Sequence, residues 1–180
     1  RMLVTTIERN PFPGRVLTGR ITSGTVKSND PIHTLNREGK EVEKGRVSKV
    51  LAFRGLERTP VDIGEAGDII AIAGLVTSTV ADTICAPQVT TPIASKPIDP
   101  PTLSVTFRIN DGPLAGREGD KVQSRVIRER LMREAEGNVA IRVTPGEDND
   151  SYDVAGRGEL QLAVLIENMR REGFELTIGR

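Results

Sequence analysis

Metal ligation and nucleophilic chemistry have few candidate residues in this 180-residue chain, which contains one histidine, His33, and one cysteine, Cys85. A structural zinc site needs four nitrogen, sulfur or carboxylate ligands in a tetrahedron, and this pair is too small a basis for one. No pattern around His33 supports a Ser-His-Asp arrangement. We therefore expect His33 to be a structural or surface residue and Cys85 to be a small buried strand residue.

Two glycine-containing stretches are the places where a phosphate group could bind. Gly112–Gly119 does not fit the G-x-x-x-x-G-K-[ST] phosphate loop, so we interpret it as a connection between a strand and a helix. Gly156-Arg157-Gly158 fits G-x-G-x-x-G only in part, because the third position after Gly158 is Gln161. We interpret it as a tight turn, although Arg157 could present its charge to a phosphate at the helix N-terminus.

Carboxylates gather at 62–65 and at 147–150. Neither segment has the spacing of a D-x-[DN]-x-[DN]-G calcium loop, and we interpret both as solvated turns. The sequence thus predicts no catalytic residue, no cofactor-binding residue and no metal site in this chain.

Basic residues offer a different chemistry, which is contact with phosphate. The net charge is zero, with 25 Lys+Arg against 25 Asp+Glu, and this argues against a protein that coats nucleic acid by bulk electrostatics. Local groups remain around one predicted hairpin and on one predicted helix: Arg37, Lys40, Lys44, Arg46, Lys49, Arg54 and Arg58, and then Arg125, Arg128, Arg130 and Arg133. A solvated charged face and a phosphate-binding face are both open readings. Since aromatic residues are only 3%, RNA would be contacted through its backbone and shape.

The first half of the chain must position these residues on strands. Residues 1–86 contain short runs rich in Val, Ile and Thr, punctuated by Gly and Pro, and the expected strands are 2–8, 15–23, 31–35, 41–53 (one long strand or a bent pair), 67–73 and 79–85. Val42 and Val47 are expected to be buried in the fourth of these. Short strands with regular turns are typical of a barrel or sandwich, and we favour an all-β barrel because closure removes exposed edges.

Residues 87–101 carry five prolines, which favour an extended, semi-rigid linker. Residues 102–180 change character. We expect a strand over 103–110, a helix from an Asp120 N-cap to about 135, strands over 138–144 and 151–155, a helix over 158–171 stopped by Gly173, and a strand over 174–178. This β-α-β-β-α-β order predicts a ferredoxin-like α+β domain.

The sequence also supports expectations about the cellular compartment and the extent of the chain. A lone thiol fits a reducing cytoplasm, and no apolar run approaches the roughly 18 residues of a membrane span, so we expect a cytoplasmic protein without a membrane partner. The sequence starts on Arg1, inside an apparent strand, and we expect it to be an excised fragment of a longer protein.

Several residue runs resemble known families. The first half resembles the second domain of translational GTPases, a β-barrel in elongation factors Tu and G, through Gly14-Arg15-Val16-Leu17-Thr18-Gly19-Arg20-Ile21. The second half is similar to the BipA/TypA family through Asn110-Asp111-Gly112-Pro113, through Ile127-Arg128-Glu129-Arg130-Leu131 and through Gly156-Arg157-Gly158-Glu159-Leu160-Gln161-Leu162. One departure is Gln161, which stands where members of the family usually have histidine.

The resemblance implies a GTPase that binds the bacterial ribosome, is linked to subunit assembly and stress adaptation, and acts as a monomer. GTP and Mg would be bound by a domain preceding Arg1, and further domains would follow Arg180. This chain would therefore be inactive by itself and would act by coupling those domains to ribosomal RNA and protein.

The resemblance also implies contact residues. In related factors the loop after the first barrel strand lies against ribosomal RNA, and the matching positions run from Asn10 to Arg15, with Arg15 the best single candidate. Arg37 and Lys40 come from the basic hairpin. Because the domain after the barrel lies between the ribosomal subunits in relatives, Arg117 and Arg157 complete the predicted set. A generic RNA-binding adaptor, or an enzyme that uses an interdomain cleft, remain alternatives.

Overall fold

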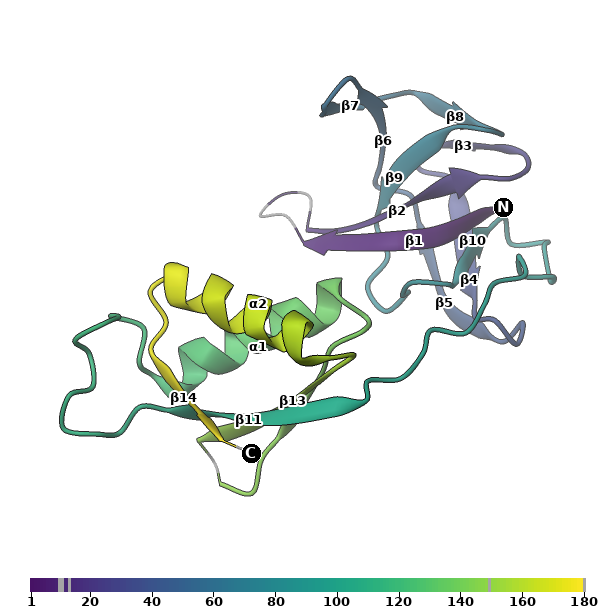
Figure 1. The fold of residues 1–180 in the computed structure, drawn as a ribbon. Helices are drawn as coiled ribbons and strands as arrows, with labels where there is room; N and C mark the ends of the chain where they lie inside the picture. Colours follow the sequence, from purple (N-terminus) through teal and green to yellow (C-terminus); the bar gives the residue numbers. More distant parts are fainter. Residues whose placement is uncertain (10–11, 13, 149, 180) are drawn as a thin grey trace. The chain divides into compact units, whose positions relative to one another are not determined.

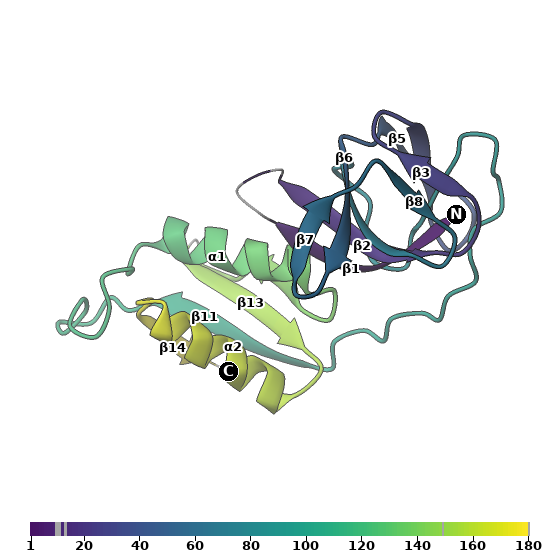
Figure 2. The same ribbon diagram turned by 90° about the horizontal axis from the view of Figure 1, so that it is seen from above.

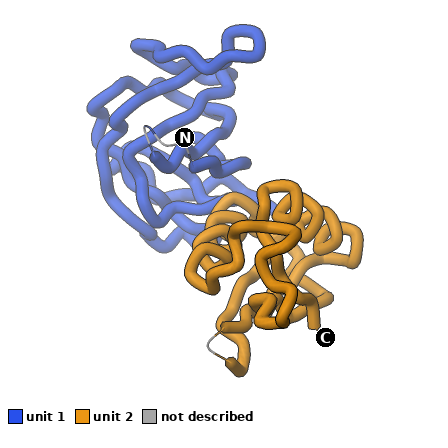
Figure 3. The backbone as a smooth tube through the Cα atoms, turned by 90° about the vertical axis from the view of Figure 1, so that its left-hand side faces the viewer, with its two compact units in different colours: residues 1–97 blue, residues 98–180 orange. Residues whose placement is uncertain are grey.

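The computed structural model describes residues 1–9, 12, 14–148 and 150–179. The chain divides into two compact units, residues 1–97 and 98–180, which are coloured blue and orange in Figure 3. The division falls inside the segment 87–101, where the prolines predict a linker. The bounds 1–86 and 102–180 of the predicted domains stay predictions.

Unit 1 is built from strands (Figure 1). An eight-stranded sheet has the order β5-β4-β10-β1-β2-β9-β6-β7, and β3 pairs separately with β8. The strands are β1 (Met2–Arg9), β2 (Arg15–Ile21), β3 (Thr25–Lys27), β4 (Pro31–Leu35), β5 (Glu41–Arg46), β6 (Lys49–Arg54), β7 (Glu57–Pro60), β8 (Ile63–Glu65), β9 (Ile69–Ala73) and β10 (Thr83–Cys85).

The core of unit 1 is aliphatic, as the scarcity of aromatic residues requires. Leu17 of β2 pairs with Ile72 of β9, and both are buried together with Val4, Val50 and Ile70. β-Branched side chains suit the pleated surface of a sheet and stabilise it when one face is buried.

Residues 41–53 were expected to form one long strand or a bent pair, and the structure shows two strands, β5 and β6, which break at Val47 and Ser48. The Val47 N–H donates to Asp30 O at 3.0 Å and its carbonyl accepts from Asn29 N at 2.7 Å, so Val47 is turned into the core between the strands. Val42 was expected to be buried and is 38% exposed, because β5 is an edge strand of the sheet. The short strands β3, β7 and β8 were missed.

The first part of the predicted linker is hydrogen-bonded to the strands of unit 1. His33 Nε2 lies 2.8 Å from Val89 O, Ile93 N donates to Thr83 Oγ1 at 2.9 Å, and Arg37 donates to a carbonyl of the same segment. The segment 87–95 therefore has no regular secondary structure but has fixed contacts within its own unit.

Unit 2 contains a four-stranded antiparallel sheet in the order β12-β13-β11-β14, with two helices on one face (Figures 1 and 2). Along the chain the elements are β11 (Leu103–Ile109), α1 (Ser124–Gly137), β12 (Arg142–Pro145), β13 (Ser151–Gly156), α2 (Glu159–Arg171) and β14 (Leu176–Gly179).

Both helices of unit 2 bury an apolar stripe. One buried cluster contains Phe107 of β11, Ile127 and Leu131 of α1, and Leu162 and Met169 of α2. Leu162 and Met169 have the helical spacing that the sequence predicted for α2. The single tyrosine, Tyr152 on β13, reaches α1 through a 2.8 Å hydrogen bond between its hydroxyl and Ser124 Oγ.

The start of α1 was predicted wrongly. The helix begins at Ser124, and its N-cap is Gln123 instead of Asp120. The four preceding residues do not continue the helix, because Lys121 pairs with Phe174 in a β-bridge and its N–H donates to Gly173 O at 3.1 Å. By contrast α2 ends where expected, and Gly173 adopts a positive φ of 87° after it.

Candidate functional site

Arg15 begins β2, and its guanidinium group contacts the loop that follows β9. One terminal nitrogen donates to the Val76 carbonyl and the other to the Ser78 carbonyl, the latter at 2.5 Å. Its Nε is buried and has no hydrogen-bond partner among the described residues. Arg15 is thus bound to the protein's own main chain, and its contact with RNA stays a prediction.

Glu43 of β5 holds the same loop through its N–H groups. Its carboxylate accepts from the amides of Val76 at 3.1 Å, Thr77 at 3.0 Å and Ser78 at 2.7 Å, and also from Ser78 Oγ. Burial raises the pKa of this carboxyl, but the hydrogen bonds from Ser78 and the loop amides outweigh burial, and the pKa lies below its ordinary value. Sequence reasoning missed Glu43, because no local pattern links β5 to a loop more than thirty residues away.

Further contacts fix the loop at both ends. Gly74 adopts φ +122°, and Leu75 is buried at 3% exposure. Ser78 is fully buried, and its hydroxyl oxygen forms a 2.8 Å hydrogen bond with Thr34 Oγ1. The side chain of Val76, in contrast, is 73% exposed. The loop therefore presents an exposed aliphatic side chain on a main chain that is held on several sides.

Of the predicted contact loop after β1, Asn10 lies outside the described residues. Phe12 is described and is 78% exposed, with Lys49 Nζ at 4.2 Å from the centroid of its ring. This distance is typical of a cation–π contact.

Arg37 and Lys40 lie on the turn between β4 and β5, and both side chains are exposed. Arg37 Nε donates to Ser95 O at 3.3 Å. The main-chain N–H of Lys40 donates to Asn36 Oδ1 at 2.8 Å, which shapes the turn and leaves the Lys40 ammonium group outside it.

The other basic residues of the predicted hairpin do not share one hairpin, because β5 and β6 are not neighbours in the described sheet. Several of them are paired within the chain. Lys44 Nζ lies 3.3 Å from a Glu41 carboxylate oxygen, and Arg58 makes a two-pronged bond to Glu8 at 2.7 and 2.5 Å. Only part of this positive charge is available to a partner.

In unit 2, Arg117 is exposed on the loop between β11 and α1, and Glu175 organises that loop. Glu175 is 8% exposed and accepts the amides of Gly116 at 3.1 Å, Glu118 at 3.0 Å and Gly119 at 3.2 Å. The amide of Glu118, foremost among these donors, lowers the pKa of the Glu175 carboxyl. The glycine-rich loop is therefore shaped around a side chain of this protein.

Arg157 is exposed in the turn between β13 and α2. Its main-chain N–H donates to Gln161 Oε1 at 2.7 Å. The Gln161 side chain thus closes the turn at the start of the helix, a role that needs an acceptor but no charge.

The two residues considered first for chemistry are both buried. His33 is 6% exposed, with its Nδ1 at 3.0 Å from Glu41 Oε2. Cys85 is 3% exposed, and burial raises the pKa of its thiol. Within the described ranges, no three His, Cys, Asp or Glu side chains are placed to hold a metal ion.

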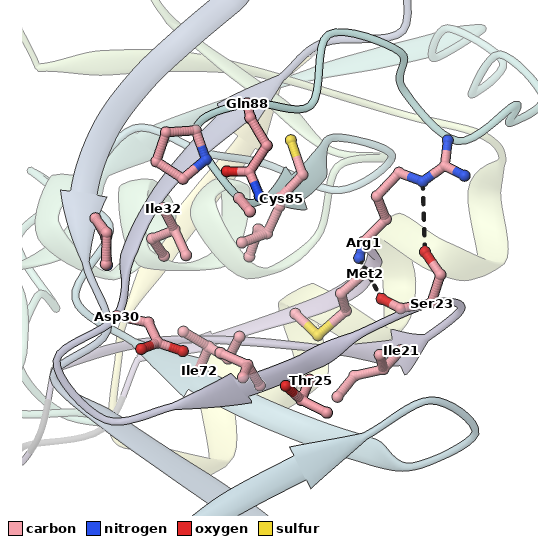
Figure 4. Close-up of a pocket in the computed structure, with 15 residues that line it drawn as sticks. Arg1, Met2, Ile21, Ser23, Thr25, Asp30, Ile32, Ile72, Cys85 and Gln88 are labelled. Atoms are coloured by element: carbon pink, nitrogen blue, oxygen red, sulfur yellow. Dashed lines mark hydrogen bonds between the residues drawn. The ribbon is translucent and has the colours of Figure 1, made fainter.

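A cavity that was not predicted lies in unit 1 (Figure 4). It has a volume of about 210 Å³ and is lined by the aliphatic side chains of Ile21, Ile32 and Ile72, with Arg1 and Asp30 among its polar residues. Its lining comes from strands that are distant in sequence, so no motif could reveal it. The cavity can accept a small apolar group.

Across the part of the chain that the structure describes, we find no helix with the length and apolarity needed to cross a membrane.

Comparison with known proteins shows what this chain is similar to. Residues 14–85 match the family model of elongation factor Tu domain 2. All 180 residues align with the large ribosomal subunit assembly factor BipA of Salmonella typhimurium at 47% identity. Over its whole length the chain is thus similar to part of BipA. Proteins of the same name from Buchnera aphidicola and Synechocystis are each 43% identical over the same 180 residues.

This chain covers 30% of the length of each of these BipA relatives. The resemblance to the BipA/TypA family is confirmed over both units, and the translation-factor β-barrel is confirmed for the first half.

Proposed function

We propose that residues 1–180 are the ribosome-docking part of a translational GTPase of the BipA type. In this proposal the chain couples a GTP-binding domain to the ribosome during subunit assembly and the response to stress. The observation that supports it is sequence identity of 43–47%, in alignments that span all 180 residues, with relatives that are named large ribosomal subunit assembly factors.

The nucleotide chemistry is proposed to take place elsewhere in the protein. No G-x-x-x-x-G-K-[ST] motif occurs in the sequence, and the described residues offer no set of metal ligands. GTP and Mg therefore do not fit the side chains of this chain, and no step of hydrolysis is assigned to it. The intact protein is proposed to be a cytoplasmic monomer whose GTP-binding and C-terminal domains are its intramolecular partners.

We assign unit 2 to the ferredoxin-like arrangement. Its element order is β-α-β-β-α-β, and the sheet order β12-β13-β11-β14 places the first and third strands in the centre. A split pair of βαβ units with both helices on one face supports this assignment.

The proposed contacts with ribosomal RNA lie at Asn10, at Arg15 or the loop that its side chain binds, and at Arg37, Lys40, Arg117 and Arg157. The exposure of the last four supports their role, because an exposed cation can reach a phosphate without disturbing the fold. Arg117 and Arg157 also lie on turns whose main chain is fixed by Glu175 and Gln161, respectively.

Co-sedimentation of the full-length protein with ribosomes tests the proposal. Two double variants, Arg37→Glu/Lys40→Glu and Arg117→Glu/Arg157→Glu, are each expected to bind more weakly. The slope of log affinity against log salt should fall by roughly 0.7 to 0.9 per lost phosphate contact. Lys27→Glu, an exposed cation outside the predicted set, is the matched control.

Wild-type protein that fails to pellet with ribosomes would contradict the docking function. Pelleting that is unchanged in both double variants at every salt concentration would contradict the contacts and leave the docking function standing.

A further inference from the structure

We infer that Arg15 and Glu43 are positioning residues that hold the loop 76–78 rigid, and that this loop, instead of the Arg15 guanidinium, makes the ribosome contact. The inference rests on the proposed docking function and refines which atoms carry it. In this inference Glu43 strengthens ribosome binding. A purely electrostatic argument would expect the opposite, because an acidic side chain repels RNA.

The two side chains bind carbonyl and amide groups of the same three residues, 76–78. Arg15 donates to the carbonyls of Val76 and Ser78, while Glu43 accepts the amides of Val76, Thr77 and Ser78. Hydrogen bonds to charged groups are shorter and stronger than neutral ones, and together these fix both faces of a short stretch of main chain. The Arg15 guanidinium is already engaged in them.

Loop 76–78, which is bound by Arg15 and Glu43, contains no charged side chain that a partner could bind. Its exposed side chains are Val76, at 73%, and Thr77, while Leu75 and Ser78 are buried. A contact made here would use shape, an aliphatic surface and one hydroxyl group. Such a contact gains from rigidity, because ordering a mobile loop on binding costs free energy.

Loop 76–78 is bound at more main-chain groups than another short turn of unit 1. The turn at 27–30 receives one side chain on an amide and one on a carbonyl, since Asp30 accepts from Lys27 N at 2.8 Å and Arg46 donates to Asn29 O at 3.0 Å. Loop 76–78 instead takes an arginine and a glutamate from two different strands, and it leaves Arg15 Nε buried without a partner in the described structure. Buried unsatisfied groups are costly and tend to persist where a function needs the geometry.

Because Arg15 begins β2, its two carbonyl partners place loop 76–78 beside the start of that strand. The loop therefore lies at a position that the proposed docking function already includes. Arg15 then matters for binding through the loop it orders.

Ribosome affinity of the full-length protein across a salt series separates the two roles. For positioning, Arg15→Ala and Glu43→Gln both weaken binding, by roughly three- to tenfold, which is the range of an ordering cost of this size. The salt slope stays unchanged in both. For direct phosphate contact, Arg15→Ala lowers the slope by about 1, and Glu43→Gln binds as well as wild type or more tightly, because it removes a negative charge.

A second pair of variants keeps the test valid if the first pair folds poorly. Val76→Gln changes the exposed surface of the loop and leaves its main-chain hydrogen bonds in place, so it should weaken binding. Leu56→Gln is the matched control, since Leu56 is a fully exposed aliphatic residue of the same unit on the hairpin between β6 and β7. Equal affinities for Val76→Gln and wild type would overturn the inference.

Amide hydrogen exchange distinguishes failure of this inference from failure of the docking function. Faster exchange at Val76, Thr77 and Ser78 in Glu43→Gln, with unchanged ribosome binding, would overturn the inference alone. Absence of binding by the wild-type protein would remove the proposed function and the inference with it.

Discussion

Both carboxylate oxygens of Glu175 accept the main-chain N–H of Gly116, each at 3.1 Å. Glu175 lies just before β14, whereas Gly116 lies in the loop after β11, so one side chain joins two distant parts of unit 2. The same carboxylate accepts from Glu118 and Gly119. The conformation of the loop that carries Arg117 therefore depends on a single acidic residue.

Replacing Glu175 by Gln should loosen this loop. Glutamine offers one acceptor oxygen where the carboxylate offers two, and the hydrogen bonds lose their charge assistance. Amide exchange at Gly116, Glu118 and Gly119 is expected to become faster, while exchange in the buried part of α2 stays as in wild type. Equal protection of the three loop amides in both proteins would refute the role of Glu175.

The pH dependence of stability should report the same carboxylate. Hydrogen bonding in the fold depresses the Glu175 pKa below its ordinary value of 4.5, so its stabilising contribution is fully present above that value. This contribution is lost as the pH falls through the lower pKa of the folded state. Urea unfolding between about pH 7 and about pH 3 should show a smaller loss of stability for Glu175→Gln than for wild type. Glu43, whose pKa is also depressed, should behave in the same way.

Gly74→Ala should be strongly destabilising. At φ +122° an added Cβ would lie 2.2 Å from Arg46 O, which is main chain and cannot move aside cheaply. We expect a loss of more than about 2 kcal/mol in the free energy of unfolding. Gly24→Ala is the control, because Gly24 has φ +81° with open space around its missing Cβ, and strain alone should cost about 1 kcal/mol. Similar losses for the two variants would show that the close approach to Arg46 is unimportant.

Removing the His33 side chain should release the segment 87–95 from the strands of unit 1. Its ring nitrogens lie at hydrogen-bond distance from Glu41 and Val89, so His33→Ala leaves both partners without it, at a cost of about 1–3 kcal/mol. Limited proteolysis should cut near Val89 faster in His33→Ala than in wild type. Lys44→Ala removes an exposed neighbour of Glu41 and should not change the cleavage rate.

The regular elements were largely predictable from the sequence, because burial of one face leaves a periodic pattern. The spacing of Leu162, Leu165 and Met169 gave α2 to within one residue, and all three are buried. Asp120 failed as an N-cap, because pairing of Lys121 with Phe174 competes with the helix, and no local signal reports a distant bridge.

The site was predictable only in part, for the same reason. Sequence and family resemblance singled out Arg15 by residue type and position, but its partners Val76 and Ser78 are more than sixty residues away. Glu43 was missed altogether, because an acidic residue on an edge strand resembles any solvated one until the fold brings a loop to it. Long-range hydrogen bonds to main chain carry no sequence motif.

Tyr152, hydrogen-bonded to Ser124 in the core of unit 2, is the only tyrosine in a chain without tryptophan. Ultraviolet-excited emission from this 180-residue chain therefore originates almost entirely in unit 2. Fluorescence would follow melting of residues 98–180 alone, whereas circular dichroism would record both halves. Comparing the two signals during heating would reveal whether the halves unfold together, with no label attached.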